Sequence, residues 1–254
     1  HLSLRRQRQM CIRDRGWAGL AVDALVLSST FVLAVWLGTR WLGLERSTAV
    51  LIGAGSSICG AAAVLATAPV ARARNDQVAV AVATVVVFGT LAVFIYPTLA
   101  AALQPAVGDP RFAGLYMGST IHEVAQVVAA GRSLGEGTAD MAIVAKLVRV
   151  LMLAPFLVAL SWWLGRDRSG RDGQSGHAGR QPAIAVPWFA VAFMAVVALH
   201  SLFPLPAVVS QAAMTLDTVL LATAMAALGL GTHHTAIRRA GIRPLILALS
   251  LIHI

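Results

Sequence analysis

The sequence predicts an all-α protein built from several membrane-spanning helices. Hydrophobic residues make up 58% of the chain and charged residues 12%, whereas soluble proteins average roughly 45–50% and about 25%. The apolar residues form long runs rich in Ala, Leu and Val that do not alternate with polar residues, unlike the strands of a membrane β-barrel. A bilayer core needs about 20 mostly apolar residues per helix. Composition therefore favours a polytopic transmembrane helical bundle.

Seven apolar runs are long enough to cross a bilayer, and an eighth begins near Pro244. In chain order they are expected at residues 17–38, 48–71, 77–103, 113–131, 139–164, 184–203 and 207–231. The longest polar connection, residues 165–183, is rich in Gly, Ser and Arg and is expected to be a loop. It separates a first membrane bundle, residues 16–164, from a second, residues 184–248.

The distribution of arginine predicts which side of the membrane each connection occupies. Loop 165–183 and the segment after Gly231 are both rich in Arg, so both are expected in the cytoplasm. Simple alternation of the preceding spans would then place Arg72 and Arg74 outside, against the same tendency. The orientation of the first half therefore stays open: either one of its runs is re-entrant, or the count of spans is wrong.

Both ends of the chain share a foreign pattern. MCIRDR at residues 10–15 and LSLIHI at 249–254 can be encoded by complementary strands of one short DNA sequence that resembles a library-preparation adapter. We therefore expect a translated metagenomic fragment in which residues 1–15 and 249–254 are not native. Residues 1–15 carry five Arg and one Asp, which is +4 of the formal +9. Without them, no basic arm for nucleic acid is expected, and Cys59 alone cannot form an internal disulfide or a Cys-based zinc site.

Two segments repeat a pattern of small and hydroxylic residues. GSSICGAAAVLA at 55–66 and GSTIHEVAQVVA at 118–129 both begin with Gly-Ser-Ser/Thr-Ile. Transporters with internal repeats often bind substrate near the midplane with discontinuous helices. Gly and Ser at mid-span weaken a helix, and hydroxyls can satisfy the freed backbone groups. We therefore expect broken helices at both copies; chance repetition in an Ala-rich chain and close packing of small residues are the alternatives.

Ionisable residues inside the apolar runs are few, and at bilayer depth such residues usually face a cavity or a partner. They are Asp23, His122, Glu123, Lys146, Arg149, His200 and Asp217. Lys146 and Arg149 share one helix face and offer cationic donors for an oxyanion. The predicted substrate-binding set is Ser56, Ser57, Ser119, Thr120, Gln126, Lys146 and Arg149. His122 and Glu123 are predicted to carry protons for ion or proton coupling.

Structural roles are the alternative for each of these groups. Lys146 and Arg149 could instead extend to a membrane surface or neutralise Glu123, and we weigh this equally with the functional interpretation. For Asp23, His200 and Asp217 a structural role is favoured.

The stretch HEVAQ, residues 122–126, comes within one residue of the His-Glu-x-x-His zinc site of metalloproteases. Gln126 stands where the second histidine is needed, and Gln is a poor zinc ligand. Of the remaining histidines, His200 lies near the end of a span, and His233 and His234 fall in a predicted loop. We therefore expect no metal, no cofactor and no catalytic residue, and the chain is not expected to be an enzyme.

Five segments, taken in order, resemble the YeiH-type family of bacterial inner-membrane proteins, which are described as sulfate exporters. They are GAGSSICGAAAVLATAP, FGTLAVFIYP, GSTIHEVAQVVAAG, AKLVRVLMLAP and LLATAMAALGLGT. The resemblance runs from about Gly16 to Ala248. It implies a longer parent protein with a fold related to sodium/bile-acid symporters and cation/proton antiporters, with inverted bundles and crossed broken helices. Two spanning copies separated by one helix would run parallel, however, which conflicts with inverted repeats.

The sequence as a whole predicts a secondary transporter of the bacterial inner membrane. Its expected cargo is a small oxyanion such as sulfate, sulfite or an organosulfonate, moved out of the cytoplasm by alternating access. A cation/proton antiporter using the same acidic group is the alternative within transport, and a membrane-embedded enzyme or sensor subunit is the alternative from another class. The expected partners are the small anionic substrate and the lipid bilayer; no nucleic acid is expected, and a homo-oligomer is allowed.

Overall fold

The computed structural model describes residues 21, 23–107, 110–169, 206–231 and 241–251, together with residues 192, 195, 196 and 199. All regular secondary structure in this part of the chain is helical. Three helical stretches are long and apolar enough to cross a membrane: Asp23–Trp41, Asn75–Leu103 and Glu136–Gly165. The prediction of an all-α membrane bundle is confirmed. The predictions made for residues 1–15, most of loop 165–183, His200, His233 and His234 fall outside the described residues.

The first Gly-Ser-Ser-Ile copy lies at a sharp reversal of the chain. α2 (Arg46–Ser57) ends there, and α3 (Ala61–Ala71) begins after a short turn. Gly60 in this turn has φ 73° and ψ −134°, a conformation that residues with a side chain rarely adopt. After the reversal, Arg74 beyond the end of α3 lies 3.2 Å from the carboxylate of Glu45 just before α2. α2 and α3 therefore form a re-entrant hairpin, here called hairpin A.

The second copy lies at a matching break between α5 (Pro110–Thr120) and α6 (Val124–Ser133). The hydroxyls of Ser119 and Thr120 donate to carbonyls one turn back in α5, at 2.7 Å and 2.6 Å. Such bonds offer the backbone an alternative to continued helix. Glu123 then takes an extended conformation and becomes the N-cap residue of α6.

Glycine contacts with α7 (Glu136–Leu151) give the direction of these two short helices. A methyl group placed on Gly114 would lie 2.6 Å from the carbonyl oxygen of Thr138, and Gly118 makes its close contacts one turn further along α7. α5 therefore runs parallel to α7. Gly131 near the end of α6 lies against Ala139 near the start of α7, so α6 runs antiparallel to α7. α5 and α6 form a second re-entrant hairpin, hairpin B.

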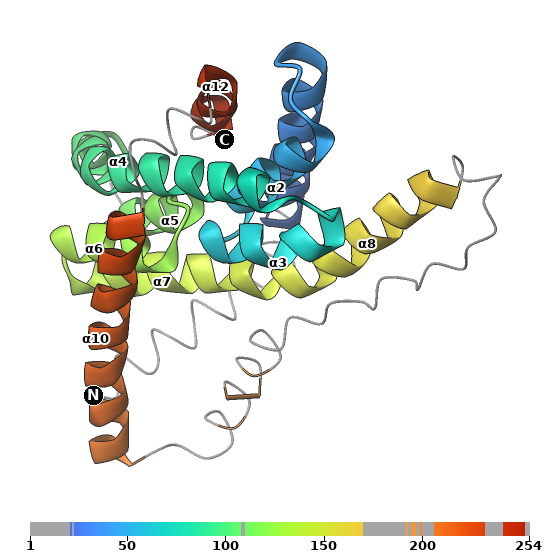
Figure 1. Ribbon diagram of the computed structural model, residues 1–254. Coiled ribbons are helices and arrows are strands. Elements are labelled where there is room, and N and C mark those ends of the chain that lie inside the picture. Colours follow the sequence, from blue (N-terminus) through green and yellow to red (C-terminus); the bar gives the residue numbers. More distant parts are fainter. Residues whose placement is uncertain are drawn as a thin grey trace.

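Two long helical segments connect the bases of these hairpins (Figure 1). α4 (Asn75–Val107) leaves hairpin A and reaches the start of hairpin B. α7 and α8 (Leu153–Ser169) then return in the opposite direction as one long rod. The join falls at Met152, because Pro155 lacks the N–H that would bond to the carbonyl of Leu151.

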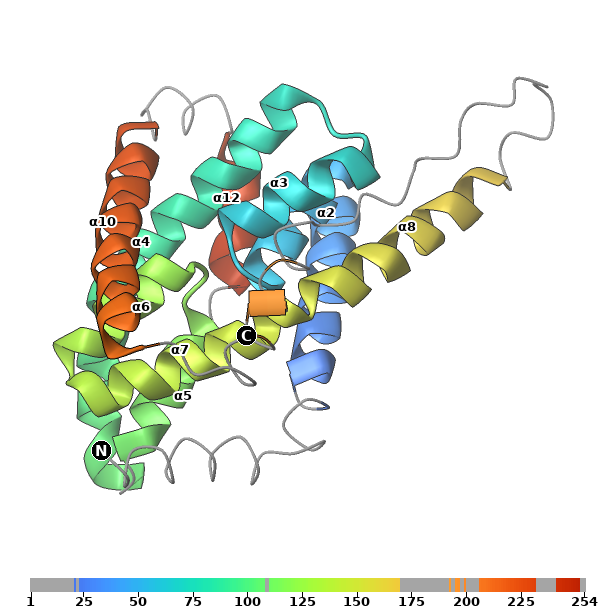
Figure 2. The same ribbon diagram turned by 90° about the horizontal axis from the view of Figure 1, so that it is seen from below.

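The two copies are therefore inverted: each is a hairpin followed by a long helix, and the hairpins enter from opposite ends of α4 (Figures 1 and 2). This corrects the expectation that residues 48–71 and 113–131 are single crossings. It also removes the conflict over parallel copies, because the Gly-Ser-Ser/Thr-Ile segments run antiparallel. The length of an apolar run does not reveal a reversal, so the sequence alone could not separate the two cases.

The arginines near hairpin A all lie at one end of the molecule. The guanidinium carbon of Arg46 stacks 4.4 Å from the ring centroid of Trp163, near the end of α8. Arg72 and Arg74 follow α3 at the same end. The described start of loop 165–183 shares this end, so Arg72 and Arg74 no longer oppose the positive-inside tendency.

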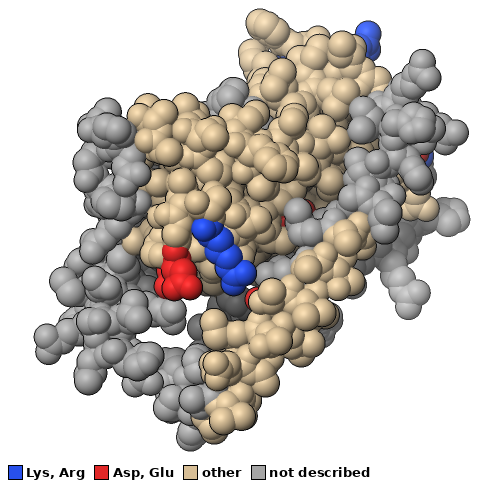
Figure 3. Space-filling model, turned by 90° about the vertical axis from the view of Figure 1, so that its left-hand side faces the viewer, with Lys and Arg blue, Asp and Glu red and all other residues tan. Residues whose placement is uncertain are grey.

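The outer surface is apolar, as expected for a protein surrounded by lipid. Large hydrophobic side chains are exposed on the first helix, α4 and α8, for example Leu25, Phe94 and Trp162. Figure 3 shows one face on which few of the described side chains are charged. Two further helices, α10 (Ala207–Gly231) and α12 (Ile242–Leu251), complete the described fold.

Candidate functional site

The tips of hairpins A and B meet inside the molecule. A methyl group placed on Gly60 would lie 3.3 Å from the carbonyl oxygen of His122 and 3.5 Å from Cβ of Glu123. Both residues belong to the turn of hairpin B. The two breaks that the repeat predicted are therefore in backbone contact, although they are far apart in the sequence.

Lys146 joins the two tips. Its Nζ donates to the carbonyl oxygens of Ile58 and Ile121, each at 2.8 Å, and the side chain is 1% exposed. These carbonyls lie just beyond the ends of α2 and α5, where helix dipoles place partial negative charge. Lys146 therefore neither extends to a surface nor forms an ion pair with Glu123 in the described structure. One of its three N–H donors remains for a ligand.

Arg149 lies one turn further along α7, on the same face. Its side chain is 6% exposed, and its Nε lies 3.7 Å from Oδ1 of Asp23 in the first helix. The structural role favoured for Asp23 is consistent with this pairing. At that distance Nε makes no hydrogen bond and is otherwise without a partner among the described residues.

Three further predicted residues place unpartnered polar atoms at the tip of hairpin B. His122 is 3% exposed and Gln126 is 1% exposed. Within the described residues, Nδ1 of His122, both amide atoms of Gln126 and Oε2 of Glu123 are buried without a hydrogen bond. Gln126 packs against Gly89 of α4 so closely that a Cβ at Gly89 would collide with its amide. Each unsatisfied buried group costs about 1–3 kcal/mol, so this cluster indicates a place for a ligand or a proton.

The predicted hydroxyls behave differently from one another. Ser57, Ser119 and Thr120 donate to carbonyls of their own helices, which leaves those oxygens able only to accept. The Oγ of Ser56 is buried and has no partner in the described structure. Ser56 is therefore the hydroxyl of this set that can still donate to an anion.

The remaining predicted ionisable residue and the one described cysteine differ in position. Asp217 is exposed on α10. Cys59 is buried as a free thiol in the turn of hairpin A. In the described part of the chain, no three His, Cys, Asp or Glu side chains gather as metal ligands.

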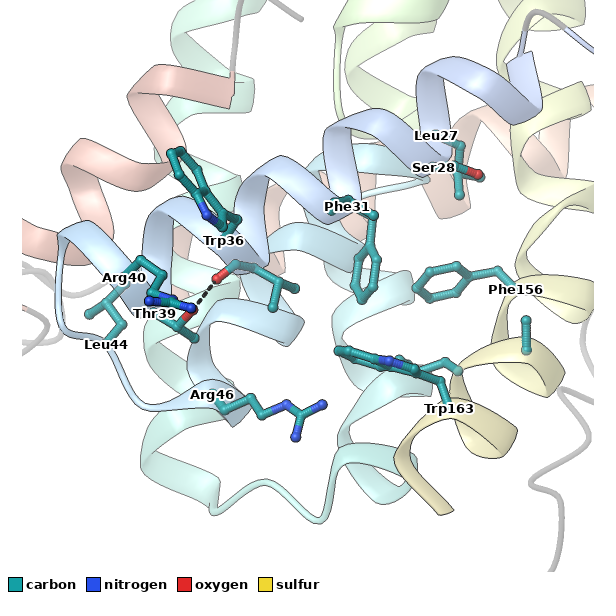
Figure 4. Close-up of a pocket in the computed structure, with 14 residues that line it drawn as sticks. Leu27, Ser28, Phe31, Trp36, Thr39, Arg40, Leu44, Arg46, Phe156 and Trp163 are labelled. Atoms are coloured by element: carbon teal, nitrogen blue, oxygen red, sulfur yellow. Dashed lines mark hydrogen bonds between the residues drawn. The ribbon is translucent and has the colours of Figure 1, made fainter. Parts of the chain in front are cut away.

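A large cavity lies elsewhere, between the first helix and α8, with a volume of about 1140 Å³. Figure 4 shows Arg40 and Arg46 toward one end of it and Leu27 toward the other, with Phe31 and Trp163 facing the space between. None of the predicted site residues lines this cavity. The position of this cavity therefore does not identify the polar centre.

Sequence reasoning missed the two carbonyl acceptors of Lys146 and the Arg149–Asp23 pair. Main-chain carbonyls carry no residue signature, so no pattern in the sequence could have named Ile58 or Ile121. The Asp23 pairing had a weak signal, because an acid inside an apolar run needs a partner.

The sequence of the chain is similar to those of known membrane proteins. A family model described as "Conserved hypothetical protein 698" matches residues 9–248. A UPF0324 membrane protein of Pseudomonas aeruginosa is 58% identical over 92% of this chain and 65% of its own length. For a UPF0324 membrane protein of Yersinia pestis, the identity is 54% over 94% of this chain and 66% of that protein. The inner membrane protein YeiH of Escherichia coli K12 is 49% identical over 94% of this chain and 67% of that protein.

No solved structure was found to match the chain. The chain spans about two thirds of the length of these curated relatives. The resemblance to YeiH-type proteins is confirmed, and the location in a bacterial inner membrane follows from the relatives and the spanning helices. The chain belongs to the conserved hypothetical protein 698 (UPF0324) family of multi-pass inner-membrane proteins, which includes YeiH.

Proposed function

We propose that this chain forms the core of a secondary transporter that exports a small oxyanion such as sulfate. The observation that carries the proposal is the meeting of two inverted re-entrant hairpins at a buried polar centre bridged by Lys146. In membrane transporters, broken helices at the interface of inverted repeats form substrate sites near the midplane. Irregular backbone at this depth is tolerated where it is buried or lines a cavity.

The polar groups at the centre support a site that is occupied during function. Among the described residues, buried side-chain atoms of Gln126, His122, Glu123 and Ser56 have no hydrogen-bond partner, whereas a purely structural core would normally satisfy them. A substrate that passes through the centre would provide partners in turn. This argument favours transport over a structural assembly role.

The charges favour an anion as the substrate. Lys146 and Arg149 both lie at the centre on one face of α7. The N-termini of α3 and α6 begin at the two tips, and helix N-termini favour negative charge. Arg149 can reorient from its long contact with Asp23 toward a bidentate oxyanion.

Cation/proton exchange is the second candidate, and one observation favours it. The hydroxyls of Ser57, Ser119 and Thr120 already donate hydrogen bonds to backbone carbonyls. Their oxygens can therefore only accept, which suits a cation. Glu123 would then bind the exchanged ion or proton, and Arg149 would be structural. A membrane enzyme or sensor subunit has no comparable support from the site.

Labelled-sulfate counterflow in proteoliposomes tests the proposal, using the gene completed to the length of its relatives. Wild-type protein should show saturable exchange that excess sulfite or taurine reduces and chloride does not. Arg149→Ala should lower exchange about tenfold or more, because a hydrogen bond to a charged group is worth about 1.5–3 kcal/mol. Arg132→Ala is the matched control, because Arg132 is exposed on α6.

Two outcomes would contradict the oxyanion assignment. Folded wild-type protein that shows no exchange with any of these anions would exclude it. Exchange that Arg149→Ala leaves intact would remove Arg149 from the site. Sodium- or potassium-driven proton movement that Glu123→Gln abolishes would then favour cation/proton exchange.

A further inference from the structure

The contact between Lys146 and the hairpin tips has the chemistry of an ion site. Two main-chain carbonyl oxygens from two different hairpins converge on one ammonium at 2.8 Å each. In the described part of the chain, neither oxygen accepts a backbone N–H. These carbonyls therefore depend on Lys146 for their hydrogen bonds.

We propose that the C-terminal ends of α2 and α5 form a monovalent-cation site, and that the Lys146 ammonium is its tethered resident cation. The proposal does not depend on which substrate is transported, or on transport at all. It assigns to Lys146 the role that a free alkali or ammonium ion would have at the same carbonyls.

Helix-end carbonyls suit such a cation for two reasons. They carry the partial negative charge of the helix dipole, and they are among the carbonyls that have no partner inside the helix. In transporters, carbonyls of unwound segments and half-helix C-termini coordinate Na⁺, and rings of carbonyls replace the hydration shell of K⁺. The Lys146 ammonium, attached to α7, takes the place of such an ion at these carbonyls. No ion has to be bound from solution.

The tether also holds three elements together at one point. Hairpin A, hairpin B and α7 meet at Nζ, so removal of the ammonium leaves two partial negative charges facing each other in an apolar interior. Burial without a counter-charge is costly for such groups. A cavity the size of the missing lysine side chain would remain beside the carbonyls, large enough to admit a small cation.

Arg149 provides the internal control. It lies on the same face of α7 and is also buried, but its partner is the carboxylate of Asp23. Loss of its charge should leave the carbonyls of Ile58 and Ile121 bonded to Lys146. A response that depends on total positive charge would affect both variants, whereas the proposed site affects only Lys146.

Thermal unfolding of the purified, full-length protein tests the proposal. Wild type, Lys146→Ala and Arg149→Ala are compared in ammonium, potassium, sodium and choline chlorides at equal ionic strength. The unfolding temperature of wild type should be the same in all four salts, and so should that of Arg149→Ala, which is expected to be lower than that of wild type because Asp23 loses its partner. Lys146→Ala should unfold at a lower temperature in choline and rise by about 2–4 °C or more, saturably, with at least one small cation.

Three results would overturn the proposal. The first is a folded Lys146→Ala protein whose unfolding temperature is the same in small cations as in choline. The second is Lys146→Ala protein that cannot be obtained folded even when ammonium or potassium is present throughout. The third is a Lys146→Gln protein as stable as wild type, because glutamine keeps an N–H donor but not the charge. Folding of Lys146→Ala only when a small cation is present would support the site.

Discussion

The Nε of Arg149 lies 3.7 Å from Oδ1 of Asp23, and this contact ties the first helix to α7. Neither charge would be tolerated alone in so apolar a setting. The distance exceeds that of a strong hydrogen bond. The two charges therefore neutralise each other, but no hydrogen bond fixes the geometry of the pair. Under the proposed function, Arg149 would leave this contact to bind an anion and return to it after the anion leaves.

Asp23→Asn is therefore expected to destabilise the protein by about 1–3 kcal/mol, because Arg149 is left as a buried charge without its counter-charge. Thermal unfolding in detergent measures the effect. The double variant Asp23→Asn/Arg149→Gln should be more stable than the sum of the single changes predicts, since the unpaired charge is gone. Strict additivity would show that the two side chains do not interact in the folded protein.

Gly60→Ala should damage the tip of hairpin A. At φ 73° an added side chain is strained, and its Cβ would lie 3.2 Å from Cγ1 of Val85. The expected cost is about 1–3 kcal/mol. Gly137→Ala is the control, because a Cβ there meets no atom within 4 Å in α7, so stability should rise slightly. Equal unfolding temperatures for the two variants would argue against a strained tip.

Gln126→Leu separates function from stability. The substitution removes two buried amide atoms that have no partner in the described part of the chain, so stability should stay the same or rise by about 1–3 kcal/mol, while transport falls. Gln77→Leu is the matched comparison, because Gln77 donates to Glu45 at 2.6 Å and accepts from the backbone N–H of Arg74 at 2.9 Å. That variant should lose stability. A destabilised Gln126→Leu protein with full transport would make Gln126 structural.

Thiol labelling tests the inverted arrangement. Arg74→Cys, at the base of hairpin A, should react with a membrane-impermeant maleimide only from the cytoplasmic side. Glu136→Cys, at the start of α7, should react only from the opposite side. Cys59 is buried and should not react, and Cys11 is replaced by Ala in both variants. Labelling of both positions from the same side would contradict the inverted hairpins.

Glu123→Gln tests proton coupling. The variant keeps the size of the side chain but cannot exchange a proton, so sulfate counterflow should persist while accumulation driven by a pH gradient is lost. Both assays use the same proteoliposomes, so sulfate counterflow verifies that the protein is folded. Unchanged gradient-driven accumulation would assign coupling to another group, with His122 as the next to test.

The sequence located the breaks but not what the chain does there. Gly-Ser-Ser-Ile and Gly-Ser-Thr-Ile marked both tips, because small and hydroxylic residues weaken a helix wherever it lies. The reversal at Gly60 depends on a backbone torsion, and run length is the same for one crossing as for a hairpin of two half-helices. The α7–α8 boundary was missed for a related reason. Pro155 interrupts the helix near Met152, but α8 continues in nearly the same direction as α7, so the apolar run looks like one helix.

The sequence predicted which residues form the candidate site more completely than it predicted their contacts. Burial of Lys146 and Arg149 was one of two equally weighted interpretations of charge inside an apolar run, and the other was extension to a membrane surface. Their actual partners, two carbonyls and Asp23, depend on tertiary packing. The sequence allowed Ser119 and Thr120 either to bond to backbone carbonyls or to face a site, and only the structure shows that they bond to their own helix.

The bonds made by Lys146 reach only main-chain oxygens at positions 58 and 121. These bonds therefore place no demand on the two side chains, although both isoleucines are fully buried and their packing restricts replacements to apolar residues of similar size. Position 146 has no such freedom, because no other residue type brings a flexible primary ammonium to both oxygens. A saturation mutagenesis survey should find an asymmetric pattern: tolerance of other aliphatic side chains at the two acceptors and near-absolute restriction at the donor.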